Sequence, residues 1–484
     1  MTILEAIREQ ALRRPAHPAL IVERQARGAP GRGAAPPERE LVSYAELVAQ
    51  LEAFAKRLRA EGVAQGDRCG LVARQGRGFV EAALGILAAE ACLVPIPDDH
   101  RGEVLERFAQ RAQLHHLLLE EDDFACRRRA EARAVDGADD RDFRALSPAY
   151  LRFTSGSTSR RKGVVLGHAT ILERLDAANR GLSIGPDDRV LWLLPMAHHF
   201  VVSILLYLSR GASILLPGSS LARPVLELAA RERASVLYAS PYHLNLLSKD
   251  GSELALDALR LAVSTAEGLR ADVAHRFAER FGTPVVQALG IIEVGLPVMN
   301  RDSAAQKPEA LGRPLPDYEV WLRGKDGRPL VGETSPERSG EICIRGPGLL
   351  DAYMDPWLPA REVLEPDGFR TGDQGWFDAD GDLHLVGRRT NRINMAGMKF
   401  FSEEVEAALD QHPGVERSRV FAREHAHLGE IPAAEILPRD AERPPAPKEL
   451  MRYCRGLLPA YKIPREFRMV EALDLTETGK LRRS

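Results

Sequence analysis

Residues 151–163 read LRFTSGSTSRRKG, a strand-like start that runs into small hydroxyl residues and glycine. Small residues let backbone N–H groups approach anionic oxygens, hydroxyl groups add donors, and Lys162 adds positive charge. The stretch therefore predicts a loop that cradles phosphate groups. A flexible surface loop rich in serine and glycine would have the same composition, so the rest of the chain must decide between the two.

The P-loop of nucleoside triphosphatases does not fit this stretch. Its pattern, G-x-x-x-x-G-K-[ST], requires a second glycine before the lysine and a hydroxyl residue after it. Counted from Gly156, the second glycine position holds Arg161, and Gly163 follows Lys162. We therefore expect a phosphate site of another class.

Strand and helix patterns alternate on both sides of the loop. Residues 67–98 predict strand, helix and strand, and residues 184–247 predict three strands separated by helices over 200–209 and 223–233. Such alternation predicts an α/β fold with parallel sheets covered by helices. After about residue 310, short strands with Asp-Gly turns predict antiparallel hairpins instead.

Composition excludes several classes of protein. The chain has 484 residues, with 66 basic and 69 acidic side chains, and this balance leaves no electrostatic footprint for nucleic acid. The longest apolar run, Phe200–Leu208, is far shorter than the roughly 20 residues of a membrane span. Five scattered cysteines without a C-x-x-C pair predict reduced thiols and no structural zinc. We expect a soluble cytoplasmic protein with no membrane insertion, and a loop over residues 24–40.

Further motifs follow the glycine-rich loop in sequence order. They are LPMAHHF (194–200), VSTAEGL (263–269), QALGIIE (287–293), FRTGDQGW (369–376), LVGRRTNRI (385–393), AGMKF (396–400), LPAYKIP (458–464) and TETGK (476–480).

Together these motifs resemble the adenylate-forming (ANL) superfamily, whose loop signature is T-S-G-[ST]-T-G-x-P-K-G. The superfamily contains acyl- and aryl-CoA synthetases, adenylation domains of peptide synthetases and beetle luciferases. The resemblance covers nearly the whole chain. It implies a large N-terminal domain of mixed and parallel sheets packed with helices over residues 1–387, carrying a small antiparallel β-barrel-like subdomain. The resemblance also implies a hinge over residues 388–391. After the hinge would come a small α+β C-terminal domain, over residues 392–484, that rotates about Thr390.

The resemblance also implies a site for ATP and magnesium. Lys480 would be the catalytic lysine that bridges the substrate carboxylate and the α-phosphate, and Lys162 would lie near the leaving pyrophosphate. Glu293 and Thr158 would bind Mg²⁺, an ion that prefers hard oxygen ligands. Asp373 would accept hydrogen bonds from the ribose hydroxyls. The residues expected to contact ATP or AMP are Thr154, Ser155, Gly156, Ser157, Thr158, Glu267, Gly290, Asp373 and Arg388.

Two further groups of residues follow from the resemblance. The pocket for the acid would be lined by His198, Tyr238, Ser240, Thr265 and Ala288. Gly397 and Lys399 would lie on a loop that enters the site when Thr390 rotates, so that a thiol can attack the adenylate.

Some positions depart from the family pattern. Ser159 stands where the family usually has glycine, Arg161 where it has proline, and Thr390 where the hinge usually carries Asp or Lys. Ile292 stands where the family usually has a threonine that contacts the α-phosphate, and Leu289 replaces the usual aromatic residue or glycine beside adenine.

The implied function is activation of a carboxylic acid, aryl or planar acyl, to an acyl-adenylate with release of pyrophosphate. The acyl group would then pass to CoA or to the phosphopantetheine of a carrier protein, so the cofactors are ATP, Mg²⁺ and one of these thiols. The partners would be a small acid and, depending on the acceptor, a carrier protein; a homodimer is left open. Alternatives are an impaired nucleotide-binding relative, a fatty-acyl or amino-acid adenylating enzyme, and a luciferase-type oxygenase.

Overall fold

The computed structural model describes residues 3–24, 38–129, 140–153, 162–332, 334–366, 368–388, 391–395, 398–425, 428–475 and 481. Its contacts divide the chain into two units. The first contains Met1–Glu319 and Arg345–Phe369, and the second contains Val320–Ile344 and Arg370–Ser484.

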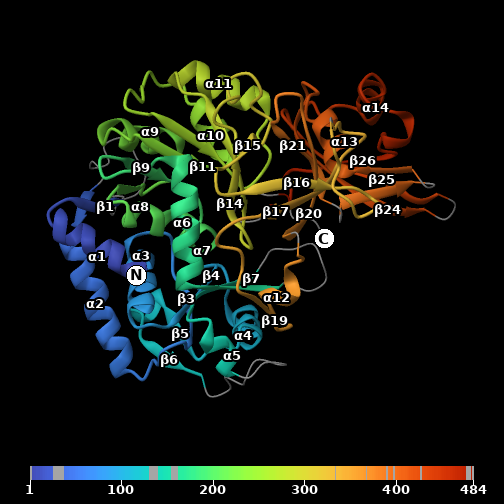
Figure 1. Ribbon diagram of the computed structural model, residues 1–484. Helices are drawn as coiled ribbons and strands as arrows, with labels where there is room; N and C mark the ends of the chain where they lie inside the picture. The colour runs from blue at the N-terminus through green and yellow to red at the C-terminus, as the bar shows by residue number, and fades with distance from the viewer. Residues whose placement is uncertain are drawn as a thin grey trace. The chain divides into compact units, whose positions relative to one another are not determined.

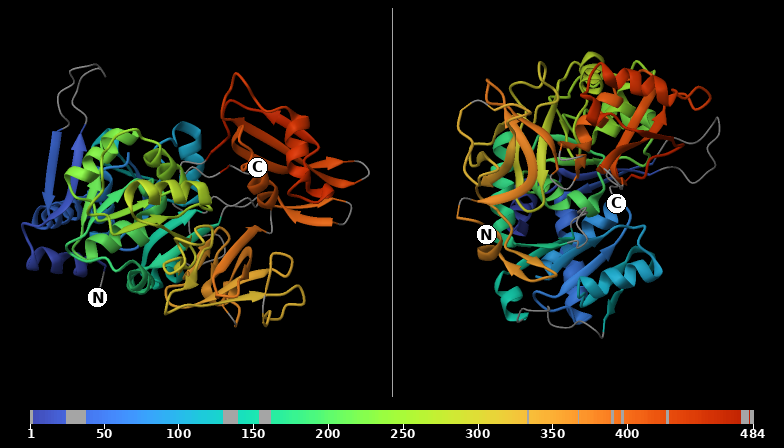
Figure 2. Two further views of the ribbon diagram at one scale, coloured as in Figure 1. Left: turned by 90° about the horizontal axis from the view of Figure 1, so that it is seen from above. Right: turned by 90° about the vertical axis from the view of Figure 1, so that its right-hand side faces the viewer.

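A nine-stranded sheet forms half of the first unit. Its six central strands are parallel, and antiparallel partners extend it at both ends. In the left view of Figure 2 the β1–β2 pair, in blue, stands at one end of this sheet. In spatial order the strands are β15 (Arg313–Pro314), β14 (Gly295–Met299), β13 (Val285–Ile291), β12 (Leu261–Ser264), β11 (Val236–Ala239), β9 (Arg189–Trp192), β10 (Ser213–Leu216), β1 (Pro18–Arg24) and β2 (Glu38–Ser43).

An eight-stranded sheet forms the other half of this unit. Four of its strands, β7, β4, β3 and β5, are parallel, and β3 and β4 are buried along their whole length. Continuous apolar strands of this kind are typical of parallel sheets covered on both faces. In spatial order the strands are β19 (Leu358–Pro359), β18 (Ala352–Met354), β8 (Gly163–Gly167), β7 (Pro148–Phe153), β4 (Cys92–Ile96), β3 (Arg68–Val72), β5 (His116–Leu119) and β6 (Cys126–Arg128).

Helices cover both faces of these sheets (Figure 1). Three of them, α9, α10 and α11, pack on the outer face of the nine-stranded sheet, and α4 and α5 pack on the outer face of the other. Helix α6 contacts β8 of one sheet and β14 of the other, so it lies between them. The described helical segments of this unit are α1 (Ile3–Arg13), α2 (Tyr44–Ala60), α3 (Arg77–Ala88), α4 (Gly102–Arg111), η1 (Glu120–Asp122), α5 (Asp140–Ala145), α6 (His168–Leu182), α7 (Met196–His199), η2 (Phe200–Ile204), α8 (Leu205–Ser209), α9 (Ala222–Arg231), α10 (Pro241–Ser248), α11 (Ala271–Phe281) and α12 (Ala360–Val363).

Local sequence accounts for the ends and irregularities of several helices. Ser43 and Glu46 form a reciprocal capping box that begins α2. The helix expected over 200–209 is present, but its first part, η2, is a π-helix, and the Ser203 hydroxyl donates a hydrogen bond to the carbonyl of His199 there. A π-turn of this kind widens the helix and is frequent beside binding sites.

The second unit begins with a four-stranded sheet in the order β16 (Glu319–Arg323), β17 (Gly340–Arg345), β20 (Phe369–Phe377) and β21 (Leu383–Arg388). Strands β20 and β21 form the antiparallel hairpin expected from the Asp-Gly turn, where Gly381 has φ +83°. The pairings among the described residues give an open order of strands, so the barrel-like closure expected for this region is not confirmed.

The remainder of this unit is an α+β fold around a five-stranded sheet. Strands β24 and β25 form a long antiparallel pair, and β26 joins β25 in parallel. Its elements are β22 (Arg392–Met395), β23 (Met398–Phe401), α13 (Ser402–Leu409), β24 (Val415–His425), β25 (Gly429–Pro438), α14 (Pro447–Arg455), η4 (Ala460–Lys462) and β26 (Glu466–Met469).

The α/β class, with large helix-covered sheets followed by a small α+β unit, is thus confirmed. The domain boundary at residue 387 and the rotation about Thr390 stay predictions, and Thr390 lies outside the described residues. No helix in the described part of the chain is long and apolar enough to cross a membrane. All five cysteines are free thiols.

Candidate active site

The glycine-rich loop connects two adjacent antiparallel strands. Strand β7 ends at Phe153, which pairs with Gly163 at the start of β8, so the two strands are antiparallel neighbours. The loop leaves β7 at the carboxyl edge of the parallel part of the sheet, where α/β folds bind ligands. Thr154, Ser155, Gly156, Ser157 and Thr158 lie outside the described residues. Lys162 is described and exposed.

Glu293 lies in the turn between β13 and β14, and a buried arginine holds this turn. Arg174, on α6, is 0% exposed and donates hydrogen bonds to the carbonyls of Ile292 (2.6 Å), Glu293 (2.8 Å) and Gly348. Burial lowers the pKa of Arg174 to about 10, which leaves it charged at neutral pH. Its three donors therefore fix the backbone from which the Glu293 carboxylate projects.

Gly348 takes part in the same arrangement. Its φ is +68°, in the left-handed region, and a Cβ added there would collide with the side chain of Arg174. Glycine is therefore required at this position for the arginine to reach the Gly348 carbonyl.

Tyr353 connects Glu293 to Lys162. Its hydroxyl donates a hydrogen bond to Glu293 Oε1 at 3.0 Å, and the Lys162 ammonium lies 4.5 Å from the centre of its ring. Burial and the Glu293 charge both raise the pKa of Tyr353, so the hydroxyl stays protonated and remains a donor. Two predicted catalytic residues, from segments far apart in the chain, thus meet on one tyrosine.

The described residues fit the expected magnesium ion through Glu293. Within the described part of the chain, Tyr353 donates to Oε1 of this carboxylate, Oε2 has no hydrogen-bond partner, and no cation forms an ion pair with either oxygen. Among these same residues, no group of three or more metal-ligating side chains occurs. A single carboxylate suits Mg²⁺, which usually takes few protein ligands and completes its shell with water and phosphate oxygens.

The predicted pocket residues lie at the ends of three neighbouring strands. Tyr238 is on β11, Ser240 and Thr265 directly follow β11 and β12, and Ala288 is on β13. Thr265 Oγ1 donates to the carbonyl of Ala288 at 3.1 Å, and all four residues are at most 7% exposed. Gly290, on the same strand, is exposed, and a Cβ there would lie 3.5 Å from Thr265 Oγ1. The structure therefore brings the predicted pocket residues of these strands together.

An aromatic cluster that the motifs did not indicate supports this region. The Trp192 ring stacks on Tyr238 with centroids 5.7 Å apart, and Tyr207 meets both rings edge-on. The Trp192 indole nitrogen and the Tyr207 hydroxyl are buried and have no hydrogen-bond partner within the described part of the chain. Both residues lie in apolar runs that predict only a strand and a helix, so no sequence signal marked them.

Two histidines adjoin the same region. His198, predicted for the pocket, is half-buried on α7, and Arg152 Nη1 donates to its carbonyl at 2.5 Å. His243, which the sequence did not single out, lies 2.8 Å from Ser240 Oγ through Nδ1, and burial lowers its pKa to about 4. His243 is therefore neutral at physiological pH.

Gln287 ties together the two segments expected around the adenine. Its Oε1 accepts a hydrogen bond from the Leu269 N–H at 2.5 Å, and its Nε2 donates to the carbonyls of Glu309 and Ala310. Segment 263–269, which carries the half-buried Glu267, is thereby fastened to β13.

In the second unit, Asp373 lies on β20 and is 5% exposed. Its backbone N–H donates to Thr371 Oγ1 at 3.0 Å, and its Cα pairs across the hairpin with that of Arg388. Lys399 lies on β23 opposite Asn394. Thr390, Gly397 and Lys480 lie outside the described residues, so their roles stay predictions.

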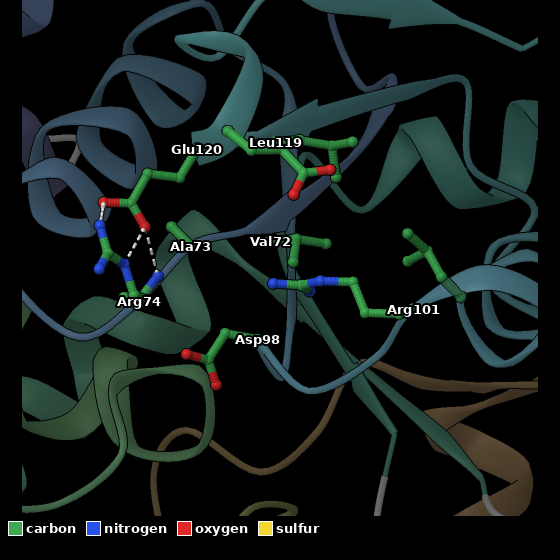
Figure 3. Close-up of a pocket in the computed structure, with 9 residues that line it drawn as sticks. Val72, Ala73, Arg74, Asp98, Arg101, Leu119 and Glu120 are labelled. Atoms are coloured by element: carbon green, nitrogen blue, oxygen red, sulfur yellow. Dashed lines mark hydrogen bonds and ion pairs between the residues drawn. The ribbon is translucent and has the colours of Figure 1, made fainter.

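A separate cavity of about 210 Å³ lies at the carboxyl ends of β3 and β5 (Figure 3). Arg74 forms an ion pair with Glu120 on its wall, at 3.2 Å. None of the predicted site residues lines it. The lining residues are Val72, Ala73, Arg74, Asp98, Arg101, Leu105, Leu119, Glu120 and Glu121.

Known proteins resemble the chain along most of its length. A feruloyl-CoA synthase from Amycolatopsis sp. is 28% identical over 464 residues, which is 91% of this chain and 92% of that protein. The phosphinothricin tripeptide synthetase PhsC of Streptomyces viridochromogenes is 29% identical over 92% of this chain and 42% of its own length. The solved anthranilate CoA ligase AuaEII, in complex with anthranoyl-AMP, shares the fold with a TM-score of 0.80 at 21% identity, covering 100% of this chain and 96% of that one.

Both sequence relatives are synthetases by name, so an impaired nucleotide-binding relative is not favoured. The model of the AMP-binding enzyme family matches residues 8–354, and the model of its C-terminal domain matches residues 404–480. The chain therefore belongs to the AMP-binding enzymes of the adenylate-forming superfamily.

Proposed function

We propose that the protein activates an aromatic or other planar carboxylic acid with ATP and transfers the acyl group to a thiol. In the first step a carboxylate oxygen attacks the α-phosphorus of ATP, and the bond to pyrophosphate breaks. In the second step a thiol attacks the acyl carbon, and AMP leaves.

The observation that carries this proposal is the contact of Lys162 and Glu293 through Tyr353. Attack of an anion on an anion requires positive charge and hydrogen-bond donors where negative charge accumulates. Lys162 supplies charge beside the loop 154–161, and Glu293 supplies the ligand for a cation. Mg²⁺, when bound, would neutralise phosphate charge and polarise the α-phosphate.

The remaining roles follow the family pattern. The hydroxyls and backbone of Thr154–Thr158 would hold phosphate oxygens, with Thr158 on the metal ion. Asp373 and Arg388, paired across β20 and β21, would hold the ribose and phosphate. Lys480 would bridge the substrate carboxylate and the α-phosphate, and rotation about Thr390 would replace it with the loop of Gly397 and Lys399.

The aryl preference rests on the chemistry of the pocket region. Tyr238, whose ring stacks on the buried Trp192, would present a flat apolar surface, which suits a planar ring. The relatives named for feruloyl and anthraniloyl groups agree with this class. CoA and a carrier-protein phosphopantetheine both remain as acceptors, because the relatives include a CoA synthase and a peptide synthetase. A cytoplasmic location and a homodimer stay predictions.

Exchange of labelled pyrophosphate into ATP tests the proposal. The purified protein is assayed with benzoates, cinnamates, fatty acids and amino acids in parallel. We expect exchange that depends on an aromatic acid and on Mg²⁺. Exchange with fatty acids or amino acids alone would contradict the aromatic substrate class but not adenylation. Release of phosphate instead of pyrophosphate would contradict adenylation.

A further inference from the structure

Arg152 is a cation at the edge of the glycine-rich loop that the family motif does not include. It is the penultimate residue of β7 and precedes the loop by two positions. Its neighbour Leu151 packs in the core beneath α4 and α5. Because side chains alternate along a strand, Arg152 points to the opposite face of the sheet, the face on which α7 contacts β4.

The guanidinium of Arg152 has few partners for its position. Nη1 donates to the carbonyl of His198, at the pocket segment, at 2.5 Å. Nε is buried and has no partner among the described residues, and within that same part of the chain no carboxylate forms an ion pair with it. An arginine that loses its hydration without an anionic partner is costly.

Two other arginines of this unit direct their donors at several acceptors. Arg174 donates to three carbonyls, and Arg280 pairs with Asp250 and donates to several carbonyls besides. Arg152, in contrast, has a buried Nε without an acceptor among the described residues, and the residue is partly exposed, so a ligand can reach it.

Arg152 contacts the segment of the predicted acid pocket and interacts electrostatically with the expected metal ligand. Burial lowers its pKa, whereas the nearby Glu293 carboxylate and Tyr150 raise it. One side of the guanidinium therefore meets His198, and its charge interacts with Glu293. In the proposed reaction, the carboxylate of an acid bound beside His198 would meet the α-phosphate of a nucleotide whose metal ion is held by Glu293.

We propose that Arg152 binds the carboxylate of the acid substrate and holds it for attack on the α-phosphorus. This assignment rests on the proposed adenylation. The carboxylate oxygen forms the new bond to phosphorus, the bond to pyrophosphate breaks, and no proton moves, so Arg152 stays protonated throughout. Its charge also offsets the loss of a hydroxyl donor at Ile292, where the family usually has threonine.

Two substitutions of Arg152 and a matched control test the assignment. Arg152→Gln removes the charge, and Arg152→Lys keeps it but loses the planar pair of donors. Arg68→Gln is the control, because Arg68 is a fully buried arginine on a strand of the same sheet that donates to the Gln113 carbonyl at 2.8 Å. Arg68 begins β3, at the end of the strand opposite to the carboxyl edge.

Two readouts are measured for each variant. Pyrophosphate exchange with benzoate, cinnamate and terephthalate gives KM for acid and for ATP, and calorimetric titration of each acid into protein with α,β-methylene-ATP gives affinity without turnover. We expect Arg152→Gln to raise the acid KM and Kd about 10-fold or more and to lower exchange about 100-fold, with the ATP KM within about 3-fold. For Arg152→Lys, the acid KM, the acid Kd and the exchange rate should lie between those of the parent protein and Arg152→Gln. Arg68→Gln should lower the stability of the protein without changing these three quantities.

The outcomes separate the two proposals. Exchange in the parent protein with unchanged acid KM and Kd in Arg152→Gln would overturn the role of Arg152 and leave adenylation standing. A loss confined to terephthalate would also overturn it, because Arg152 would then recognise a second anionic group. Absence of carboxylate-dependent exchange in the parent protein would overturn adenylation itself. If Arg152→Gln does not fold, the acid KM of Arg152→Lys is used instead. A raised acid KM supports the role of Arg152, and an unchanged one overturns it.

Discussion

The charged half of the site and its aromatic half are held in place by different forces. The charged half, Lys162, Arg174, Glu293 and Tyr353, depends on a few directed hydrogen bonds, donated by a buried arginine to backbone carbonyls and by a tyrosine to a carboxylate. The aromatic half, Trp192, Tyr207 and Tyr238, depends on ring packing and leaves polar atoms unpaired. Removing one donor from the charged half should therefore cause a large loss of stability or of exchange activity. Removing one polar atom from the aromatic half should cause only a small change in either.

Removing Arg174 should have the largest effect. Arg174→Met would leave three carbonyls without their donor, so we expect unfolding free energy to fall by at least about 3 kcal/mol and exchange to be lost. Urea denaturation measures the first effect. Arg180→Met on the same helix is the control, because Arg180 is exposed and, among the described residues, pairs only with Asp317; it should change stability by less than about 0.5 kcal/mol. A loss under about 1 kcal/mol in Arg174→Met would contradict the role of this arginine.

Tyr353→Phe, within the charged half, should lower the exchange rate clearly while lowering the stability only a little. The ring under Lys162 remains, but Glu293 loses its donor, so we expect exchange to fall about 10-fold and stability by about 1 kcal/mol. The KM for Mg²⁺ and the exchange rate are measured together. An unchanged rate would show that the hydroxyl does not position Glu293.

The pH dependence of stability should report on the pocket region next to the aromatic half, through His243 beside Ser240. Its pKa is about 4 in the folded protein and near 6.5 in the unfolded chain, so the unfolded chain binds more protons between these values. The contribution is full above about pH 6.5 and is lost as pH falls towards 4, with a slope of at most about 1.4 kcal/mol per pH unit. His243→Asn should flatten the curve of unfolding free energy over this range. Superimposable curves would exclude His243 as the cause.

Tyr207→Phe should have the smallest effect on the fold. The hydroxyl is buried without a partner among the described residues, so its removal should leave stability unchanged or raise it by up to about 1 kcal/mol. Exchange with cinnamate and 4-hydroxycinnamate is then compared. A changed ratio would place the hydroxyl against the substrate ring, whereas a stability loss above about 1 kcal/mol would mean that the hydroxyl is bonded in solution.

Sequence motifs predicted the fold class and the residues at strand ends that carry the family pattern. Glu293, Lys162, His198, Thr265 and Ala288 could be named because each lies in a short local motif, whereas Tyr238 and Ser240 were named only from the segments that line the pocket of the family. Arg174 and Tyr353 could not be named from the sequence. In ERLDAANRGL, Arg174 resembles any surface arginine of a helix, and its three acceptors come from distant segments. Trp192 and Tyr207 were hidden for a similar reason, since apolar periodicity marks burial but not which buried rings meet.

The barrel-like closure was implied by the family resemblance, whereas the sequences of the hairpins encode turns but not which edge strands pair. Short Asp-Gly hairpins satisfy their own hydrogen bonds locally, so they carry little information about closure of the sheet. The roles of Lys480, Thr390 and Gly397 rest on the family pattern alone.

The most direct test of the central claim is carboxylate-dependent pyrophosphate exchange in the parent protein and in Glu293→Gln. The amide keeps an oxygen that accepts from Tyr353, so stability should change little while the charge is lost. We predict exchange that requires an aromatic acid in the parent protein and falls about 100-fold in the variant. Exchange that is absent in the folded parent protein, or equal in both proteins, would contradict the account.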